Sequence, residues 1–312
     1  MLEWLYPLAF VLGGMVLIFK AAEKSTENAL TISRMLGISE LAIGFVLLSI
    51  STSLPELVIS VSAALRGSSD LSVGNVFGAN ITDVTLVLGV AAILGVVTVK
   101  RQNLKELVMV LLATSVISLL FVIYQPGRVT GAILFGIFLA YTYWLLSSKS
   151  RSGKSHLRLR FTRKMAAPLF GFSIFITLVI ISAQLVVENA IKLSGMLGLA
   201  ETVIGATIIS VGTTLPELSV SISAARRNHE KMAVGNAVGS SIMNLTLVFG
   251  TALMINPQIT FEPAEKLIVI SVIANMVLLY LITIRGGLTK KDGVGLALGY
   301  LAFLAIFGLG NL

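Results

Sequence analysis

The sequence TSLPEL at residues 52–57 returns almost unchanged as TTLPEL at residues 213–218. The register between the two copies stays constant around them. With a shift of 161 residues, 27–89 aligns with 188–250 without a gap, and 30 of the 63 pairs are identical. Shared apolar composition cannot hold one register over that length, so the chain contains an internal duplication.

The duplicated segments lie in a very apolar chain. Of its 312 residues, 56% are hydrophobic and 12% are charged, and the mean hydropathy is +0.95, whereas soluble domains carry about 25% charged residues. Apolar stretches long enough to cross ~30 Å of hydrocarbon recur along the chain. We place them at residues 4–20, 38–65, 71–97, 104–123, 129–147, 165–187, 199–225, 232–255, 266–284 and 293–311. Backbone groups in lipid must pair within their own segment, so we expect helices.

Five of these spans fall in each copy. We expect residues 1–147 to form a first five-helix repeat, 148–164 a basic linker and 165–312 a second five-helix repeat. Because five is odd, the second copy must enter the membrane from the opposite side. The sequence therefore predicts an all-α polytopic membrane protein with ten transmembrane helices arranged as two inverted repeats. Such repeats are typical of secondary transporters, whose sites lie near the midplane.

The basic residues indicate the orientation. With the amino terminus outside, 19 of the 23 Lys and Arg residues fall in inner loops and four in outer loops, as the positive-inside rule requires. We expect a multi-pass protein of the cell membrane whose basic 148–164 loop is cytoplasmic. The membrane orientation of the loops then accounts for the net charge of +8, which needs no nucleic-acid partner. We predict contact with the lipid bilayer and none with nucleic acid.

Three acidic residues, Glu56, Asp83 and Glu217, lie inside predicted spans away from their ends. A charge there costs at least ~2.5 kcal/mol on insertion scales and needs a partner or a function. Glu56 and Glu217 are mates in the repeat, so the duplication brings two carboxylates to one pseudo-symmetric point. They could be protonated acids that only join helices, but no basic residue lies in a span away from its ends, and a bound cation is the simplest partner.

A proline precedes each of these glutamates. Pro55 and Pro216 lack the N–H that would bond four residues back, and their rings crowd that carbonyl. The residues before them, Leu54 and Leu215, are disfavoured in helical geometry. We therefore expect the second and seventh helices to be broken, which frees backbone oxygens where they line a cavity.

Hydroxyl and amide groups complete an all-oxygen set around the carboxylates. They are Thr52, Ser53, Thr213 and Thr214 on the turns of the two glutamates, with Ser240 and Asn244, the mate of Asp83, on the facing eighth span. Ca²⁺ takes 6–8 oxygen ligands in flexible geometry, whereas Mg²⁺ requires a tighter octahedron. Na⁺ is close to Ca²⁺ in size and accepts the same atoms. The chain has no Cys, and both His residues lie in basic loops, so we expect no thiolate or histidine metal site and no cofactor.

Two motifs, STSLPE/GTTLPE and GNxxG (74–78 and 235–239), each occur twice at a fixed spacing. Together they resemble the cation/Ca²⁺ exchanger (CaCA) superfamily, and most closely its prokaryotic sodium/calcium exchangers. The resemblance covers essentially the whole chain. It implies a secondary active antiporter that exchanges Na⁺ for Ca²⁺, electrogenically, by alternating access at a central two-glutamate site. It also implies that the first and sixth spans slide when access switches.

The resemblance also implies roles for single residues. Glu56 and Glu217 match the glutamates that bind Ca²⁺ and share it with Na⁺, and Thr52 and Thr213 match threonines that add oxygens to the Ca²⁺ site. The remaining matches are the hydroxyls of Ser53 and Thr214 at flanking Na⁺ sites, a Na⁺-ligating serine at Ser240, backbone carbonyls at Ser49 and Ser210, and a central polar pair at Asp83 and Asn244.

Two departures from the family pattern leave the counter-ion open. Ala79 stands where the first-repeat serine is expected, and Asp83 and Asn244 are exchanged relative to prokaryotic members. A Ca²⁺/H⁺ antiporter or a K⁺-dependent exchanger of the same fold is therefore the alternative.

Other classes fit less well. An intramembrane protease would need an Asp pair, a Ser/His dyad or zinc ligands, so we expect no enzyme. A channel would normally place its pore on an oligomer axis, whereas here one chain holds both half-sites. We accordingly expect a monomer to function.

Overall fold

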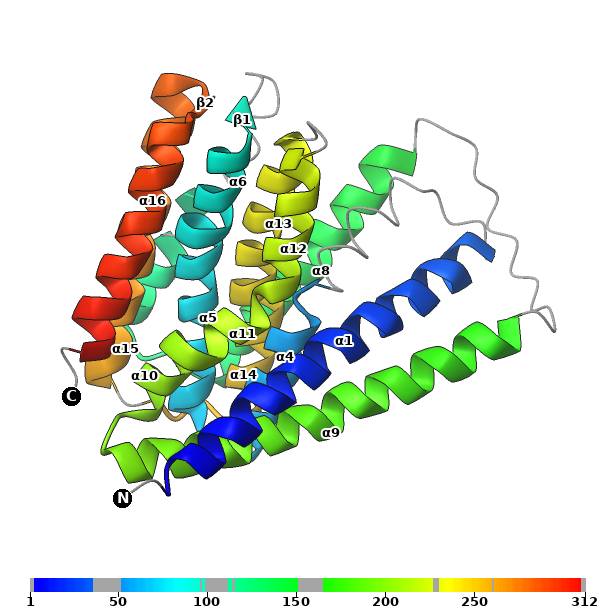
Figure 1. Cartoon of the computed structure of the whole chain (residues 1–312), viewed down its shortest axis with the longest axis vertical. Helices are drawn as coiled ribbons and strands as arrows, with labels where there is room; N and C mark the ends of the chain where they lie inside the picture. The colour runs from blue at the N-terminus through cyan, green and yellow to red at the C-terminus, as the bar shows by residue number, and fades with distance from the viewer. Residues whose placement is uncertain are drawn as a thin grey trace.

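The structure, a computed structural model, describes residues 3–35, 52–95, 97–98, 112–113, 116–150, 165–226, 230–259 and 261–309 (Figure 1). The predicted helical class is confirmed within these ranges. Five described helices are long and apolar enough to cross a membrane, or six if the bent pair Glu201–Thr213 and Leu215–Ile222 forms one span. Parts of the predicted second and fourth spans lie outside the described residues, so the number ten stays a prediction.

The elements fall into two series along the chain. The first comprises α1 (Leu5–Met35), α4 (Leu54–Leu65), α5 (Ser69–Thr82), the π-helix η2 (Asp83–Val87), α6 (Leu88–Leu94), β1 (Val97–Thr98) and α8 (Arg128–Ser150). The second comprises α9 (Ala166–Leu197), α10 (Glu201–Ile204), η4 (Gly205–Ile209), α11 (Ser210–Thr213), α12 (Leu215–Arg226), α13 (Glu230–Met243), η5 (Asn244–Phe249), α14 (Gly250–Ile255), α15 (Phe261–Arg285), β2 (Gly287–Leu288), α16 (Lys290–Phe303) and η6 (Leu304–Leu309).

The second series repeats the first in structure as well as in sequence. A displacement of 161 residues converts the bounds of α4 into those of α12, and the bounds of α5 into those of α13. Repeat mates run in opposite directions: α1 against α9, α5–α6 against α13–α14, and α8 against α16 (Figure 1). The long helices α1 and α9 also pack along each other. The arrangement of the whole chain as two inverted five-helix repeats stays a prediction.

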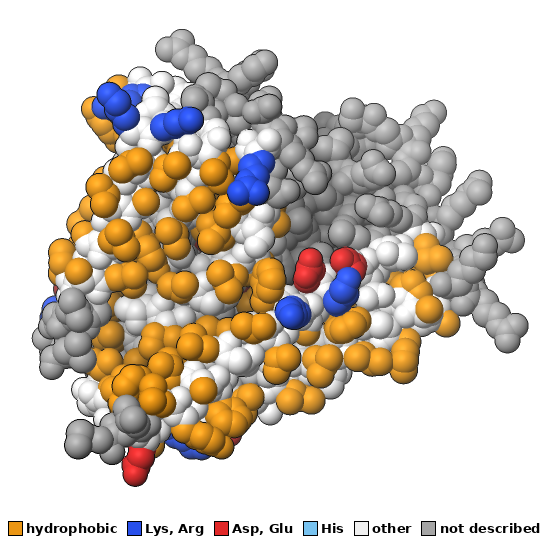
Figure 2. Space-filling view, viewed as in Figure 1, with side chains coloured by type: hydrophobic (Ala, Val, Ile, Leu, Met, Phe, Trp, Pro, Cys, Tyr) orange, Lys and Arg blue, Asp and Glu red, His pale blue; other side chains and the backbone are white. Residues whose placement is uncertain are grey.

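The third and eighth predicted spans form the centre of the molecule. In their most apolar windows, Ser69–Leu94 is 83% buried and Ala233–Ile255 is 78% buried, against 28% for Ala166–Leu197. By contrast, hydrophobic side chains cover much of the outer face seen in Figure 2, as expected of helices that face lipid. Polar residues on the two central spans are therefore shielded from both lipid and water.

Glycines allow the closest helix crossings. A Cβ on Gly74 would lie 2.3 Å from the carbonyl oxygen of Thr202, so α5 crosses the α10–η4 segment backbone against backbone. Elsewhere, Gly89 meets Gly293, and Gly250, the repeat mate of Gly89, meets Gly131. The two halves therefore use mirrored glycine contacts.

The chain is interrupted beside Glu217, where the two parts of the bent pair meet at 40°. The turn residue is Thr214 (φ −83°, ψ 4°), and Ser53 has nearly the same conformation (φ −83°, ψ 8°) before α4. The sequence predicted that the non-helical residue would lie one position later, at Leu54 and Leu215. These leucines instead begin the new helices, because a proline at the second helical position needs no N–H partner there.

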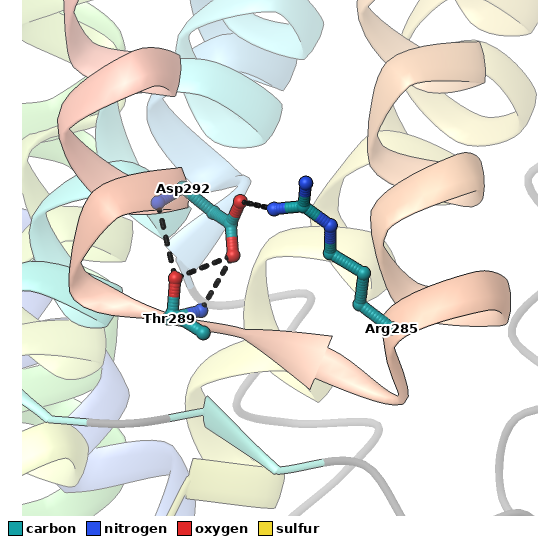
Figure 3. Close-up of polar contacts among 3 residues, drawn as sticks. All are labelled: Arg285, Thr289 and Asp292. Atoms are coloured by element: carbon teal, nitrogen blue, oxygen red, sulfur yellow. Dashed lines mark hydrogen bonds and ion pairs between the residues drawn. The ribbon is translucent and has the colours of Figure 1, made fainter.

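The sequence predicts no strand, yet β1 and β2 pair antiparallel, with Val97 opposite Leu288. A polar cluster follows β2. The Asp292 carboxylate accepts hydrogen bonds from the hydroxyl and the N–H of Thr289, and it forms an ion pair with Arg285 (Figure 3). These contacts hold the pKa of Asp292 below its usual value, chiefly through the Thr289 hydroxyl. With the reciprocal bond from the Asp292 N–H to Thr289, they form a capping box that fixes the start of α16.

Candidate cation-binding site

Glu56 and Glu217 occupy equivalent places at the starts of two helices. Each is the third residue of its helix, α4 or α12, and follows a proline. Their side chains are 1% and 0% exposed. A helix N-terminus carries partial positive charge, which favours a carboxylate at this position. The two interruptions of the chain therefore aim two helix N-termini at two buried acids.

An asparagine holds each glutamate-bearing helix against the next span. Asn75 Nδ2 donates to the Glu56 carbonyl oxygen at 3.2 Å, and Asn236 Nδ2 donates to the Glu217 carbonyl oxygen, also at 3.2 Å. Each amide also donates a hydrogen bond to a serine on the glutamate-bearing helix, at 2.9 Å in the first half and 3.3 Å in the second. This network is the same in both halves. Sequence reasoning saw these asparagines only within the glycine motifs that pack helices; their recurrence in both copies was the signal that could have revealed their role.

Polar contacts also join the two halves across the site. Thr213 Oγ1 donates to Asn75 Oδ1 at 3.2 Å and lies against Glu56. In the reverse direction, Thr52 and Ser53 interact with Glu217. Each glutamate is therefore approached by hydroxyl groups of the opposite repeat, and the predicted threonines lie beside the carboxylates.

The carboxylate oxygens are mostly without protein partners. Ser240 Oγ donates to Glu217 Oε1 at 3.1 Å. Among the described residues, no side chain completes a hydrogen bond to Glu217 Oε2, to either carboxylate oxygen of Glu56 or to either of Asp83. No Lys, Arg or His is among the described buried residues. Buried carboxylates without such partners are costly, so this arrangement needs a cation or protons.

Asp83 and Asn244 are repeat mates, and each begins a π-helix, η2 or η5. Asp83 is fully buried and close enough to Glu217 and Glu56 for their charges to interact. The Asn244 amide donates to Asn80 Oδ1 at 3.2 Å, which joins the two halves a second time. The π-helices were not predicted; such turns occur frequently at functional sites.

The other predicted ligands differ in whether their oxygen atoms are free to bind an ion. The Thr214 hydroxyl donates to the Ser210 carbonyl oxygen at 2.8 Å and keeps its own lone pairs. The Ser210 carbonyl already accepts from Thr213 and from the Thr214 N–H as well, so these bonds must weaken before it can bind an ion. Ser49 lies outside the described residues.

The donor atoms suit a hard cation. In the described part of the chain, no three Asp, Glu, His or Cys side chains gather closely enough to hold a metal by themselves. Two glutamates, with hydroxyl, amide and carbonyl oxygens from both halves, can instead supply the larger oxygen shell that Ca²⁺ takes. The unpaired oxygens of Glu56 and Glu217 fit such an ion.

Comparison with known proteins agrees with this chemistry. The sequence profile of the sodium/calcium exchanger protein family matches residues 6–147 and 167–309. The sodium/calcium exchanger MaX1 of Methanosarcina acetivorans is 30% identical over 335 residues, covering 94% of this chain and 96% of that protein. The inner membrane protein YrbG of Escherichia coli is 33% identical over 262 residues, 80% of each chain.

A solved structure is similar over nearly the whole length. The sodium-calcium exchanger NCX_Mj, soaked with Na⁺ and Sr²⁺, superposes with a TM-score of 0.67 at 25% sequence identity, covering 98% of this chain and 99% of that one.

Proposed function

The chain belongs to the sodium/calcium exchanger protein family, of the CaCA superfamily and similar to its prokaryotic members, and on that premise we propose that it exchanges Na⁺ for Ca²⁺ at a site centred on Glu56 and Glu217. It is a membrane transporter of the cation/Ca²⁺ exchange class and not an enzyme. We propose that exchange proceeds by alternating access and needs no cofactor.

One observation carries the proposal: two symmetry-related glutamates are buried with unpaired oxygens and with hydroxyls of the opposite half beside them. Two carboxylates balance the charge of one Ca²⁺, and the surrounding oxygens provide the rest of its shell. Na⁺ accepts the same ligands with half the charge, so several Na⁺ ions can replace one Ca²⁺. Competition for shared carboxylates then couples the two fluxes.

Alternating access follows from the proposed membrane arrangement. We propose ten spans in two inverted repeats, with the amino terminus outside and the 148–164 loop in the cytoplasm. The opposite directions of repeat mates and the mirrored glycine contacts support this. Because each half approaches the other's glutamate, a movement of one half relative to the other changes both ligand sets together. One chain contains both sets, so a monomer is sufficient.

The environment of Glu56 supports a second candidate function, that of a Ca²⁺/H⁺ antiporter. Glu217 accepts a hydrogen bond from Ser240, but the mate of that serine is Ala79, and both oxygens of Glu56 are unpaired among the described side chains. A carboxyl with this environment is the group on which a proton could replace Na⁺.

Uptake measurements separate the two candidates. Proteoliposomes loaded with Na⁺ are diluted into Na⁺-free buffer that contains Ca²⁺, and Ca²⁺ entry is followed. Parallel vesicles carry a proton gradient and no Na⁺. We expect entry only with internal Na⁺. Entry driven by the proton gradient alone would transfer the assignment to Ca²⁺/H⁺ exchange, and entry without any counter-ion would indicate a channel.

A further inference from the structure

A groove of about 450 Å³ lies at the surface of the molecule between α15 and α16. Its walls are mainly apolar: Ile273 and Val277 of α15 face Gly299 and Phe303 of α16. Ile273 is 56% exposed and Val277 44% exposed. The groove is separate from the cation site, and none of the predicted ion ligands lines it.

The groove exists because the two helices pack on different partners. α16 packs against α6 and η2, whereas α15 packs mainly against α5. Two glycines of α16, Gly295 and Gly299, line the resulting gap, and a Cβ on either one would have no atom within 4 Å. These glycines do not serve a helix crossing, unlike Gly74, so their small size leaves space for another molecule.

The length of the groove matches one leaflet of a bilayer. From Lys291 to Phe303 the helix rises about 18 Å, close to half of the ~30 Å hydrocarbon thickness. Lys291 and Asp292 lie at one end and apolar side chains along the rest. The Asp292 carboxylate is already engaged by Thr289 and Arg285 (Figure 3), whereas Lys291 has no ion pair among the described residues. The polar end therefore offers a cation at the first turn of a helix, a favourable place for a phosphate.

We propose that this groove binds one anionic phospholipid, with an acyl chain between α15 and α16 and its phosphate at Lys291. Figure 2 shows the basic side chains at the upper end of an otherwise hydrophobic face over α16, the distribution expected for a lipid with its head group at the interface. A neutral lipid could fill the apolar part but would leave Lys291 without a counter-charge.

The bound chain also supports the ion-binding span. The groove floor includes Ile81 and Thr85, four residues apart around Asp83. Because the floor residues face the lipid, Asp83 at the midpoint between them faces the opposite side of the same turns, toward the glutamates. The Thr85 hydroxyl bonds to the Ile81 carbonyl, so it presents an apolar surface to the groove. The lipid thereby packs directly behind η2.

Native mass spectrometry of the purified full chain tests the proposal, with phosphatidylglycerol and phosphatidylcholine of identical acyl chains offered in equal amounts. We expect one retained phosphatidylglycerol. K291Q should weaken its retention about fivefold, the contribution of one basic residue near an anionic surface, whereas the neighbouring K290Q should leave it unchanged. G299L should displace both lipids. The matched control is G136L, because Gly136 on α8 also has open space around it.

Photocrosslinking gives a second measurement that needs no variant. A phosphatidylglycerol with a photoactivatable acyl tail should label peptides of α15 and α16 in the wild-type protein. Equal retention of the two lipids, retention of phosphatidylglycerol by G299L, equal losses in K291Q and K290Q, or labelling confined to other helices would each overturn the proposal.

Discussion

Replacing Gly74 by alanine perturbs the crossing on which the site is built. A Cβ at position 74 would lie 2.3 Å from the Thr202 carbonyl oxygen, 2.9 Å from the Ala206 N and 3.0 Å from the Gly205 Cα. All three are backbone atoms and cannot rotate away. To restore contacts of about 3.5 Å, α5 and the α10–η4 segment must separate by more than about 1 Å.

The expected loss of stability follows from two opposing effects. Overpacking costs up to about 3 kcal/mol, and alanine recovers at most about 1 kcal/mol through its better helix propensity, so we expect a net loss of about 2 kcal/mol. Function should suffer as well. The hydrogen bond from Thr213 to Asn75 is already 3.2 Å long, and a separation of about 1 Å exceeds what such a bond tolerates.

The assay compares heat-induced unfolding of G74A and G136A in detergent, together with Ca²⁺ uptake in proteoliposomes. A Cβ at position 136 would have no neighbouring atom within 4 Å, so the same chemical change should leave the midpoint unchanged or raise it. Unfolding is often irreversible for such proteins, so midpoints must be compared at one heating rate. A G74A midpoint equal to or above that of the wild type, with normal uptake, would refute the reasoning.

Three further changes test other parts of the structure. A79S places a hydroxyl where the second half has one, so the Na⁺ concentration for half-maximal exchange should fall by about tenfold, the low end of what one hydrogen bond to a charged group contributes; an unchanged Na⁺ dependence would mean that the missing hydroxyl is irrelevant. T213V keeps the shape but removes the bond to Asn75, and should raise the Ca²⁺ concentration for half-maximal uptake while expression stays normal; wild-type uptake would place this hydroxyl outside the site. D292N should cost about 0.3–1.5 kcal/mol by weakening the capping box with Thr289. Because the folded pKa of Asp292 is lowered, the stability difference between wild type and D292N should be full above the unfolded pKa of about 3.9 and shrink as the pH falls through the folded pKa; a pH-independent difference would contradict this.

Much of the architecture could be predicted because it depends on local chemistry. The apolar composition predicts membrane helices, and the fixed 161-residue register predicts that the elements repeat. Pro216 predicts the bend at the seventh helix, since no tertiary contact can replace its missing N–H. The carboxylates of Glu56, Asp83 and Glu217 are conspicuous in apolar segments, where each needs a reason to be present.

What the sequence did not reveal depends on how distant segments meet. Asn75 and Thr213 are 138 residues apart, and their contact exists only because η4 crosses α5 at Gly74. The pairing of β1 with β2 likewise joins the end of α6 to the end of α15. The π-turns at Asp83 and Asn244 were not predicted, because a π-helix of one turn inside a longer helix is too short to set a periodicity of its own.

The most direct test of the two-glutamate site is Ca²⁺ uptake by E56Q and E217Q proteoliposomes, beside E188Q as an isosteric control at an exposed glutamate. Each site substitution removes one of the two charges that balance Ca²⁺. We predict that Na⁺-driven uptake is lost in both site variants and preserved in E188Q. Undiminished uptake in either E56Q or E217Q would contradict the account, because the exchange site would then lie elsewhere in the fold.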